Sequence, residues 1–179
     1  MGVIYHLLEV DQVVELVSFL SGSEWPYHEK PFLSEQDVRA SWEKELYSGV
    51  GKESYLMMER GVPVGFLRLF DLTDSTALFD IRIASNARGR GLGKKGVNWL
   101  TEHLFCSHGH IERIEAYTRV DNEGMRRTLL RCGYVMEGYH RRSWSHPRGL
   151  CDSVAYAMLR TDWETGKMTP VPLDEFMRF

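Results

Sequence analysis

The sequence is short of cysteine and of long apolar runs. Its three cysteines are scattered through 179 residues, whereas small secreted domains that depend on disulfides carry an even set at regular spacing. No run of about 18 apolar residues exists, so no membrane span is expected. The amino-terminal residues lack a positively charged segment followed by an apolar stretch, so no secretion signal is expected either. We predict a cytoplasmic protein with reduced thiols and no membrane partner.

The chain also lacks a large excess of positive or negative charge. The formal net charge is −3, in a chain that is 43% hydrophobic and 26% charged. This slightly acidic balance argues against a partner such as nucleic acid, which is bound through bulk positive charge. The chain has no internal repeat, low-complexity tract or linker, so its length is most simply that of one domain with one sizeable core.

One short segment contains residues that could bind a metal. Cys106, His108 and His110 offer three potential ligands within one short segment. The other histidines and cysteines provide no matching pair at the spacing of a zinc site. We therefore interpret this segment as a solvated loop and predict no metal.

What the sequence does contain is a glycine-rich turn between a strand pattern and a helix pattern. Residues 77–84 place apolar side chains at alternate positions, which predicts a half-buried strand. Residues 92–104 repeat apolar side chains at helical spacing. Between them lie Gly89, Gly91 and Gly93. Because glycine loses the most conformational entropy on folding, three glycines so close together indicate that the backbone itself is needed there.

A turn of this kind before a helix is suited to bind phosphate. The first N–H groups of a helix have no partner within it, and the helix dipole adds positive charge at that end. Arg88, Arg90, Lys94 and Lys95 supply full charges. The alternative is an ordinary helix cap or tight surface turn. A P-loop is excluded because Arg88 stands where its first glycine is required and Lys95 replaces its hydroxyl residue. A Rossmann turn is disfavoured because this turn lies in mid-chain, behind apparent antiparallel strands.

Two motifs resemble those of the GNAT superfamily of acyl-CoA-dependent N-acyltransferases. Residues 88–93 fit the family pattern Arg/Gln-x-x-Gly-x-Gly/Ala, after a strand that ends at residues 83–85. Residues 120–125 and 131–138 resemble the family's helix that begins near an asparagine and closes in Lys/Arg-x-Gly-Phe/Tyr, with the Glu-Gly turn of the Rim-type (ribosomal-protein-alanine acetyltransferase-like) branch. The resemblance covers roughly residues 1–163.

The resemblance implies a single α+β domain. We expect a mixed, mostly antiparallel sheet of about seven strands with helices on both faces, which agrees with the order of strand and helix patterns along the chain. One predicted helix starts at a capping box, residues 34–37, and runs to about Tyr47. Residues 164–179 lie beyond the domain, and their apolar side chains predict packing on the domain or on the other subunit of a homodimer.

The implied activity is an N-acetyltransferase, which moves an acetyl group from acetyl-CoA to an amine by direct attack in a ternary complex. No covalent enzyme intermediate and no metal are expected. The acceptor would be a protein or peptide amino terminus, or a small-molecule amine. The alternative is a non-catalytic acyl-CoA-binding sensor or partner-binding module.

The glycine-rich turn and the motif match together indicate which residues bind acetyl-CoA. The strand before the turn would present backbone N–H groups to the thioester oxygen. Asn122 stands at the start of a predicted helix, so it is either its N-cap or a contact to the pantetheine arm. The full predicted set for acetyl-CoA is Ile81, Arg82, Ile83, Arg88, Gly89, Arg90, Gly91, Leu92, Gly93, Lys94 and Asn122.

The catalytic residues are less clearly marked. Asp80 is the predicted base because it lies on the strand that should line the acyl site; the equal alternative is a salt bridge to Arg82. Many family members have a tyrosine seven residues after the helix asparagine, where it protonates the leaving thiolate, but Leu129 stands here. Other hydroxyl or thiol groups that could supply this proton are on Tyr134, Tyr139 and Cys132.

The acceptor site should come from the loop at residues 25–28, the second predicted helix and the connection between the last two strands. Trp25 and His28 are the predicted acceptor contacts, since aromatic rings attract cationic amines. Equally, these rings could form a hydrophobic plug between helices.

Overall fold

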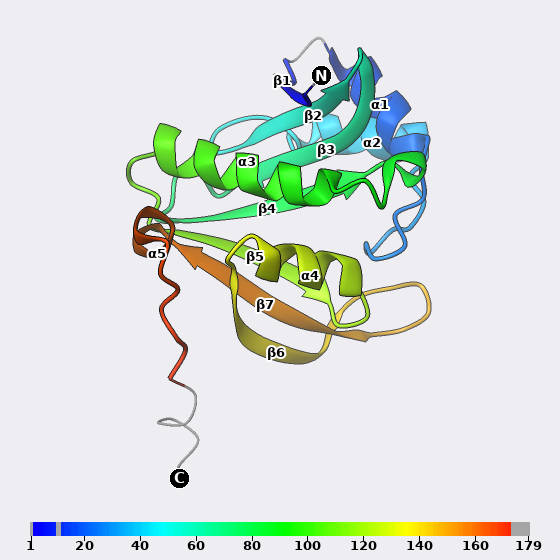
Figure 1. Cartoon of the computed structure of the whole chain (residues 1–179). Helices are drawn as coiled ribbons and strands as arrows, with labels where there is room; N and C mark the ends of the chain where they lie inside the picture. Colours follow the sequence, from blue (N-terminus) through cyan, green and yellow to red (C-terminus); the bar gives the residue numbers. More distant parts are fainter. Residues whose placement is uncertain (1, 10–11, 173–179) are drawn as a thin grey trace.

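The computed structural model describes residues 2–9 and 12–172, which contain one seven-stranded sheet. The strand order is β1-β2-β3-β4-β5-β7-β6 (Figure 1). All neighbours are antiparallel except β4 and β5. The strands are β1 (Ile4–Leu7), β2 (Glu53–Glu59), β3 (Val62–Phe70), β4 (Thr76–Ile83), β5 (Arg113–Arg119), β6 (Val135–Trp144) and β7 (Cys151–Leu159).

Helices lie against both faces of this sheet. They are α1 (Val13–Ser21), α2 (Glu35–Glu43), α3 (Leu92–Ser107), α4 (Glu123–Arg131) and α5 (Arg160–Thr165). In Figure 1, α3 and α4 lie in front of the sheet and α2 lies behind it. Side-chain contacts agree, because Met57, Leu67 and Ile81 meet α3 whereas Phe66, next to Leu67 along β3, packs against Tyr47 on the opposite face. The predicted α+β architecture is therefore confirmed.

The long helix α3 approaches the sheet closely because Gly96 has no side chain. A Cβ atom at this position would lie 2.8 Å from Cδ1 of Ile81 and 3.2 Å from Sδ of Met57. Cβ atoms almost never lie 2.8 Å from another heavy atom, so a larger residue would force either these side-chain ends or the helix to shift. Gly96 thus holds the first turns of α3 against β4.

Strands β4 and β5 pair over only a short stretch. Their parallel register joins Thr76–Leu78 to Arg113–Glu115 and then stops. Beyond that point β4 stays paired with β3, and β5 stays paired with β7. The two middle strands therefore separate toward the end of the sheet where the glycine-rich turn lies (Figure 1). This separation opens the centre of the sheet.

Two local features show how the backbone turns. Arg60 and Gly61 form the hairpin turn between β2 and β3, and both have positive φ angles, 52° and 78°. The helix that begins after the capping box ends at Glu43 and not near Tyr47. The left-handed backbone of Glu45, with φ of 52°, is incompatible with further helix.

The predicted boundary at residue 163 falls inside α5, which runs from Arg160 to Thr165. Beyond this helix, Thr169 donates from its N–H and its hydroxyl to the carboxylate of Asp162, at 3.0 and 2.6 Å. Residues 173–179 lie outside the described part, so packing of the tail on the domain or on a second subunit stays a prediction. Among the described helices, none combines the length and the apolar composition needed to cross a membrane.

The capping box of α2 provides a test of local stability. Oγ of Ser34 accepts a hydrogen bond from N–H of Asp37 at 3.1 Å, and the Asp37 carboxylate accepts one from N–H of Ser34 at 3.0 Å. We expect Ser34→Ala to lower the free energy of unfolding by about 1 kcal/mol, because an N–H at the helix start loses its partner. Urea unfolding followed by circular dichroism would measure this.

Ser18→Ala is the control, since Ser18 is exposed within α1. It should leave stability unchanged or slightly higher, because alanine has the better helix propensity. Equal losses in the two variants would contradict the assignment of the cap.

Candidate active site

Two cavities meet where β4 and β5 separate. One, here called the glycine-turn cavity, has a volume of about 500 Å³ and lies between the glycine-rich turn, the start of α4 and the 25–28 loop. The other, the α2-side cavity, has a volume of about 490 Å³ and reaches from β4 and β5 to α2 and the end of β6. Five residues line both cavities: His28, Ile81, Arg82, Asn122 and Met125. A molecule in one cavity can therefore meet a molecule in the other at these residues.

The backbone of the glycine-rich turn adopts a conformation that favours glycine, as the sequence predicted. Gly89 and Gly91 have φ angles of 76° and 75°, which side chains disfavour. Gly91 is the N-cap of α3, and no side chain caps this helix. The space around both glycines is open. The first N–H groups of α3 are thus accessible to an anion in the glycine-turn cavity.

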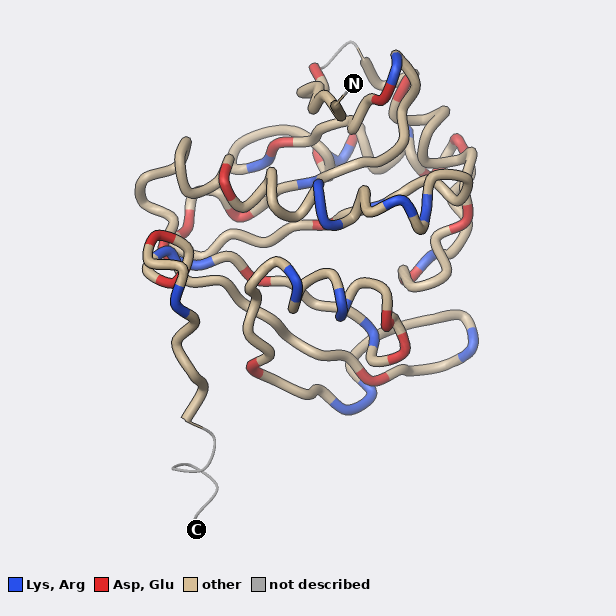
Figure 2. The backbone as a smooth tube through the Cα atoms, in the orientation of Figure 1, with Lys and Arg blue, Asp and Glu red and all other residues tan. Residues whose placement is uncertain are grey.

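Basic residues surround this helix start. Figure 2 shows Lys and Arg positions on the first turns of α3 and along α4. Lys94, Arg88 and Arg131 line the glycine-turn cavity, while Lys95, the next residue along α3, is not among its lining residues. The charge needed for a phosphate group is therefore present, and it comes from two helices.

The two arginines of the turn are both engaged within the protein. Arg88 donates from Nε to the carbonyl of Ile83 at 3.0 Å and from Nη2 to the carbonyl of Glu24. Arg90 pairs with the carboxylate of Glu59 at the end of β2. Arg88 thereby ties the turn to the loop that follows α1. Contact of Arg88 and Arg90 with phosphate stays a prediction, and it would require these bonds to rearrange.

The edge of β4 supplies backbone donors at the meeting point of the cavities. N–H of Ala84 donates to the carbonyl of Val64 on β3 at 3.0 Å. Because successive N–H groups of a strand point to opposite sides, those of Ile81 and Ile83 point away from β3, toward the gap left by β5. Such donors are suited to stabilise negative charge on an oxygen atom.

His28, Asp80 and Arg82 form a charged cluster at the same place. Nε2 of His28 lies 2.9 Å from Oδ1 of Asp80, and Nε of Arg82 lies 3.0 Å from Oδ2. Burial alone would raise the pKa of the Asp80 carboxyl, but the charges of Arg82 and His28 outweigh it and hold this pKa well below its usual range. Asp80 is therefore ionised. It forms the salt bridge to Arg82 that was the alternative to a role as base.

The ionised carboxylate also fixes the imidazole. Asp80 can only accept, so Nε2 of His28 carries the hydrogen in this contact. In the neutral ring, Nδ1 then has the lone pair. Nδ1 is buried and has no hydrogen-bond partner among the described residues. The arrangement of base and orienting carboxylate is one that proteins use for proton transfer.

Trp25 does not line the α2-side cavity. Its side chain is 1% exposed, its indole N–H donates to the carbonyl of Leu20 at 2.8 Å, and its ring packs on Phe19. The guanidinium groups of Arg82 and Arg88 lie 5.5 and 5.9 Å from its ring centre. Trp25 therefore packs as a hydrophobic plug, which was the alternative to a contact with the acceptor. It also lines the glycine-turn cavity.

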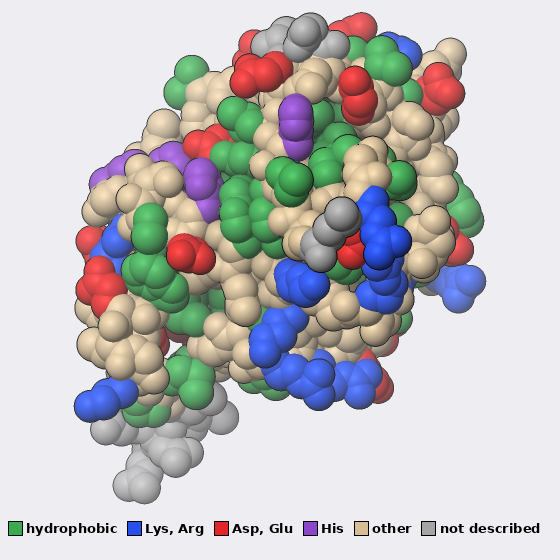
Figure 3. All heavy atoms as spheres, turned by 45° about the horizontal axis from the view of Figure 1, so that its top comes forward, with side chains coloured by type: hydrophobic (Ala, Val, Ile, Leu, Met, Phe, Trp, Pro, Cys, Tyr) green, Lys and Arg blue, Asp and Glu red, His purple; other side chains and the backbone are tan. Residues whose placement is uncertain are grey.

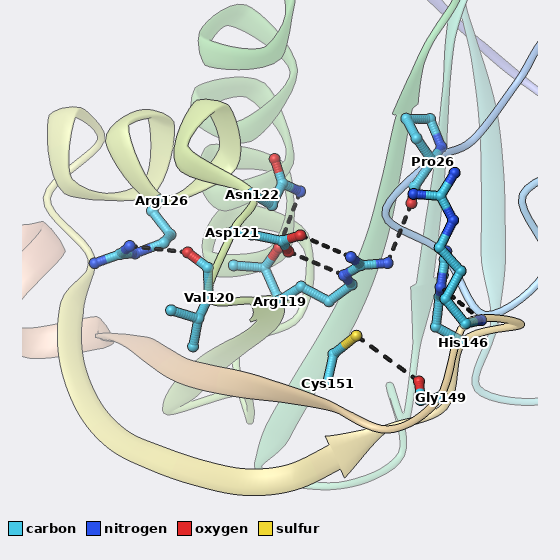
Figure 4. A network of polar contacts seen from close by, with 11 residues as sticks. Pro26, Arg119, Val120, Asp121, Asn122, Arg126, His146, Gly149 and Cys151 are labelled. Carbon is cyan, nitrogen blue, oxygen red and sulfur yellow. Dashed lines mark hydrogen bonds and ion pairs between the residues drawn. The ribbon is translucent and has the colours of Figure 1, made fainter.

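Arg119, which the sequence did not single out, holds the 25–28 loop in place. Figure 4 shows its guanidinium between Asp121 and the carbonyl of Pro26. The two bonds to Asp121 measure 3.0 and 2.7 Å, and the bond to Pro26 measures 3.3 Å. Since Pro26 and Arg119 are far apart in the sequence, no local pattern could have revealed this contact. Through it, the end of β5 positions His28.

Asn122 caps α4 and also lies at the junction of the cavities. Its Oδ1 accepts from N–H of Met125 at 3.2 Å, and its Nδ2 donates to Oγ1 of Thr118 at 3.0 Å (Figure 4 shows the second bond). The N-cap interpretation is thus confirmed. A contact from this side chain to a ligand stays a prediction.

The residues considered for protonation of the leaving thiolate lie outside the cavities. Leu129, which stands where many family members have a tyrosine, is fully buried in the core. Tyr134 is also fully buried, its hydroxyl bonds to Oγ1 of Thr101 at 2.8 Å, and burial raises the pKa of its phenol. The Tyr139 hydroxyl donates to Asp152, and the Cys132 thiol faces the carbonyl of Lys94. Within the described part of the chain, none of these four lines either cavity.

The α2-side cavity is rich in charge. Carboxylates of Glu29, Asp37, Asp80 and Glu115 line it together with the cations of Lys30, Arg68 and Arg82. Most of these carboxylates are paired within the protein, such as Asp37 with Lys30 at 3.1 Å. Part of its lining comes from the loop after α1, from α2 and from Trp144, which belong to the segments that the sequence suggested for an acceptor, and the rest comes mainly from β3, β4 and β5.

The sequence and the structure were compared with known proteins. The model of the acetyltransferase (GNAT) family matches residues 17–134, more than half of the chain. No curated protein matches the sequence.

Several solved structures share the fold. A chimera of the spermidine N-acetyltransferase SpeG from Vibrio cholerae and hSSAT superimposes with a TM-score of 0.78 at 17% identity, over 92% of this chain and 99% of that one. The Vibrio cholerae spermidine N-acetyltransferase in complex with CoA and spermine gives 0.76 at 17%, over 91% and 98%. A probable acetyltransferase gives 0.75 at 20%, over 90% and 95%. At these identities the likeness shows the fold alone.

The charged cluster predicts a dependence of stability on pH. We expect Asp80→Asn to lower the free energy of unfolding by about 2 kcal/mol at pH 7, because Arg82 loses a charged acceptor. The folded pKa of Asp80 is depressed, so its contribution is complete above the unfolded pKa of about 3.9 and is lost as the pH falls below it. The difference between wild type and variant should therefore shrink below pH 4. Urea unfolding at pH 7, 5 and 3 would show this.

Asp74→Asn is the matched control, since Asp74 is exposed. Its effect should stay within about 0.5 kcal/mol at each pH. A difference for Asp80→Asn that does not change with pH would refute the assignment of a depressed pKa.

Proposed function

Because the chain belongs to the acetyltransferase (GNAT) family, we propose that it transfers an acetyl group from acetyl-CoA to a primary amine. The observation that carries this proposal is the meeting of two cavities at His28, beside the unpaired edge of β4. One cavity has the properties of a phosphate-binding site and the other is lined with carboxylates. A thioester and an amine that enter from opposite sides would come together at this point.

The glycine-turn cavity is the proposed site of acetyl-CoA. Its pyrophosphate would bind the N–H groups at the start of α3, with Lys94 and Arg131 adding charge. The pantetheine arm would lie between β4 and α4, beside Asn122 and Met125. The thioester oxygen would accept hydrogen bonds from N–H of Ile81 or Ile83, which stabilises the oxyanion as it forms.

The α2-side cavity is the proposed site of the amine. Its volume of about 490 Å³ suits a small molecule, and the carboxylate of Glu29 in its lining favours a cation. The structural neighbours described as spermidine N-acetyltransferases make a linear polyamine the first acceptor to test. A peptide amino terminus, suggested by the Rim-type motif, is the other acceptor to test.

His28 is the proposed base, and Asp80 the residue that positions it. This reverses the expectation that Asp80 itself takes the proton, because a carboxylate with a depressed pKa is a weak base. Nδ1 of His28 would accept the proton that the amine loses on attack, and Asp80 would stabilise the resulting imidazolium. Transfer is direct, since no cysteine of the described part lines either cavity.

A sensor that binds acyl-CoA without catalysis is the competing function. It is motivated by Leu129, which leaves no hydroxyl at the place where many relatives carry a tyrosine. The His28–Asp80 pair favours catalysis, because a sensor has no use for an oriented base at the junction of two cavities. Release of CoA that depends on an added amine would separate the two functions.

Lys94 offers a test of the acetyl-CoA site. We expect Lys94→Ala to weaken acetyl-CoA binding about tenfold, because one charged contact to phosphate is lost. Isothermal titration calorimetry at two salt concentrations would measure the dissociation constants. Lys95→Ala removes the same charge from the neighbouring position outside the cavity and should change affinity less than twofold. Equal losses in the two variants would mean that only the overall charge of the helix matters.

His28 offers a test of the chemistry. We expect His28→Gln to lower kcat about 100-fold with spermidine, or with whichever amine of a panel proves active, because the proton acceptor is lost. The dissociation constant of acetyl-CoA should change far less, because the proposed phosphate contacts at the start of α3 are kept. Release of CoA, followed with a thiol reagent, gives kcat, and calorimetry gives the affinity. His6→Ala removes an exposed histidine elsewhere and should keep full activity. Full activity of His28→Gln would refute its role as base.

A further inference from the structure

A second cluster of titratable side chains lies at the other end of α3. It consists of Glu53 at the start of β2, His103 in the last turns of α3 and His108 just after this helix. Nε2 of His103 is 2.8 Å from one carboxylate oxygen of Glu53, and Nε2 of His108 is 3.1 Å from the other. The three donor atoms all lie within 4.8 Å of one another. From the start of α3 to His103 the helix rises about 16 Å, so this cluster is separate from the proposed active site.

The cluster is held rigidly by its neighbours. The imidazole of His103 stacks on Trp99, with ring centres 5.0 Å apart and planes 6° apart, and Trp99 stacks in turn on Tyr5. Nδ1 of His103 has Oγ of Ser107 at 3.5 Å, on the side away from Glu53. A second hydrogen bond of this kind, from the other ring nitrogen, is what orients histidines that bind metals.

His108 points an unsatisfied nitrogen into the cluster. Its Nε2 is buried and makes no well-directed hydrogen bond with any described residue, although the Glu53 carboxylate is 3.1 Å away. Buried polar atoms without a hydrogen bond are rare in proteins and call for a partner. A cation between the two histidines and the carboxylate would provide one.

We propose that Glu53, His103 and His108 bind a divalent transition-metal ion, with zinc the best match. Two imidazoles and one carboxylate are a common ligand set for zinc, and a water molecule would complete a tetrahedral site. Ligand atoms about 2.1 Å from such an ion lie about 3.4 Å apart. The observed separations approach this value, so small side-chain movements suffice.

Figure 3 shows several histidine side chains close together at the left edge of the molecule, away from the group of Lys and Arg side chains near its centre.

The proposed metal site differs from the segment that the sequence analysis considered as a possible metal site. Of Cys106, His108 and His110, only His108 takes part: Cys106 is exposed, and Nε2 of His110 lies 2.7 Å from the carbonyl of Leu72. We predicted no metal because the sequence shows no second pair of ligands at the spacing of a zinc site. The proposal replaces that prediction. A bound ion would connect the end of α3 to β2 and so stabilise the domain, without taking part in acetyl transfer.

The experiment uses the full chain, stripped with EDTA and dialysed into metal-free buffer. Zinc should bind with a stoichiometry of one ion per chain and raise Tm by several degrees at an ion concentration about 100 times the dissociation constant. Cobalt, used as a coloured substitute, should give the strong visible absorption of a tetrahedral site. Glu53→Gln and His103→Asn should each weaken zinc binding at least 100-fold, since even outer residues of metal sites contribute 10- to 100-fold.

His110→Asn is the matched control, because it removes a neighbouring histidine that lies outside the cluster. It should leave the zinc affinity and the cobalt spectrum unchanged. His108→Asn changes a residue beyond the last turn of α3 and tests the site without altering this helix. The proposal is overturned if zinc fails to raise Tm, if His103→Asn and His108→Asn bind zinc as well as wild type, or if His110→Asn loses the ion equally.

Discussion

The separation of β4 from β5 after Leu78 is the feature on which the proposed active site depends. Breaking the ladder between two central strands leaves N–H and C=O groups without partners in the middle of the domain, which is costly unless something else binds them. The structure keeps this opening because each strand stays paired on its other side, with β3 or with β7. The edge of β4 is thereby available to a ligand, and both cavities reach it.

The charged groups at this opening are arranged by contacts between distant segments. Arg82 and His28 hold Asp80 ionised, and Arg119 holds the loop that carries His28. The side chains of Asp80, Arg82 and Arg119 are mostly buried, so their charges require partners. Asp80 orients the imidazole of His28 through Nε2, and Nδ1 is left without a partner among the described residues. We propose that this nitrogen accepts the proton of the acceptor amine.

Helix α3 connects the two sites that we propose. Its first turn presents N–H groups and positive charge to one cavity, and its last turns carry His103 toward Glu53. Gly96 allows the helix to lie close to Ile81 of β4. An ion that fastened the end of α3 to β2 would therefore steady the helix whose start we propose as the phosphate site.

The sequence by itself determined the features that depend on near neighbours in the chain: the glycine-rich turn, the capping box at Ser34, the Asn122 cap and the order of strands and helices. These follow from backbone conformation and from side-chain period, which act over a few residues. Only the tertiary structure decided which charges meet. It joined Arg88 to Glu24, Arg90 to Glu59 and His28 to Asp80, and it brought Glu53 beside His103 and His108. These partners lie far apart in the sequence, and burial on a shared face, which no local pattern encodes, is what brings them into contact.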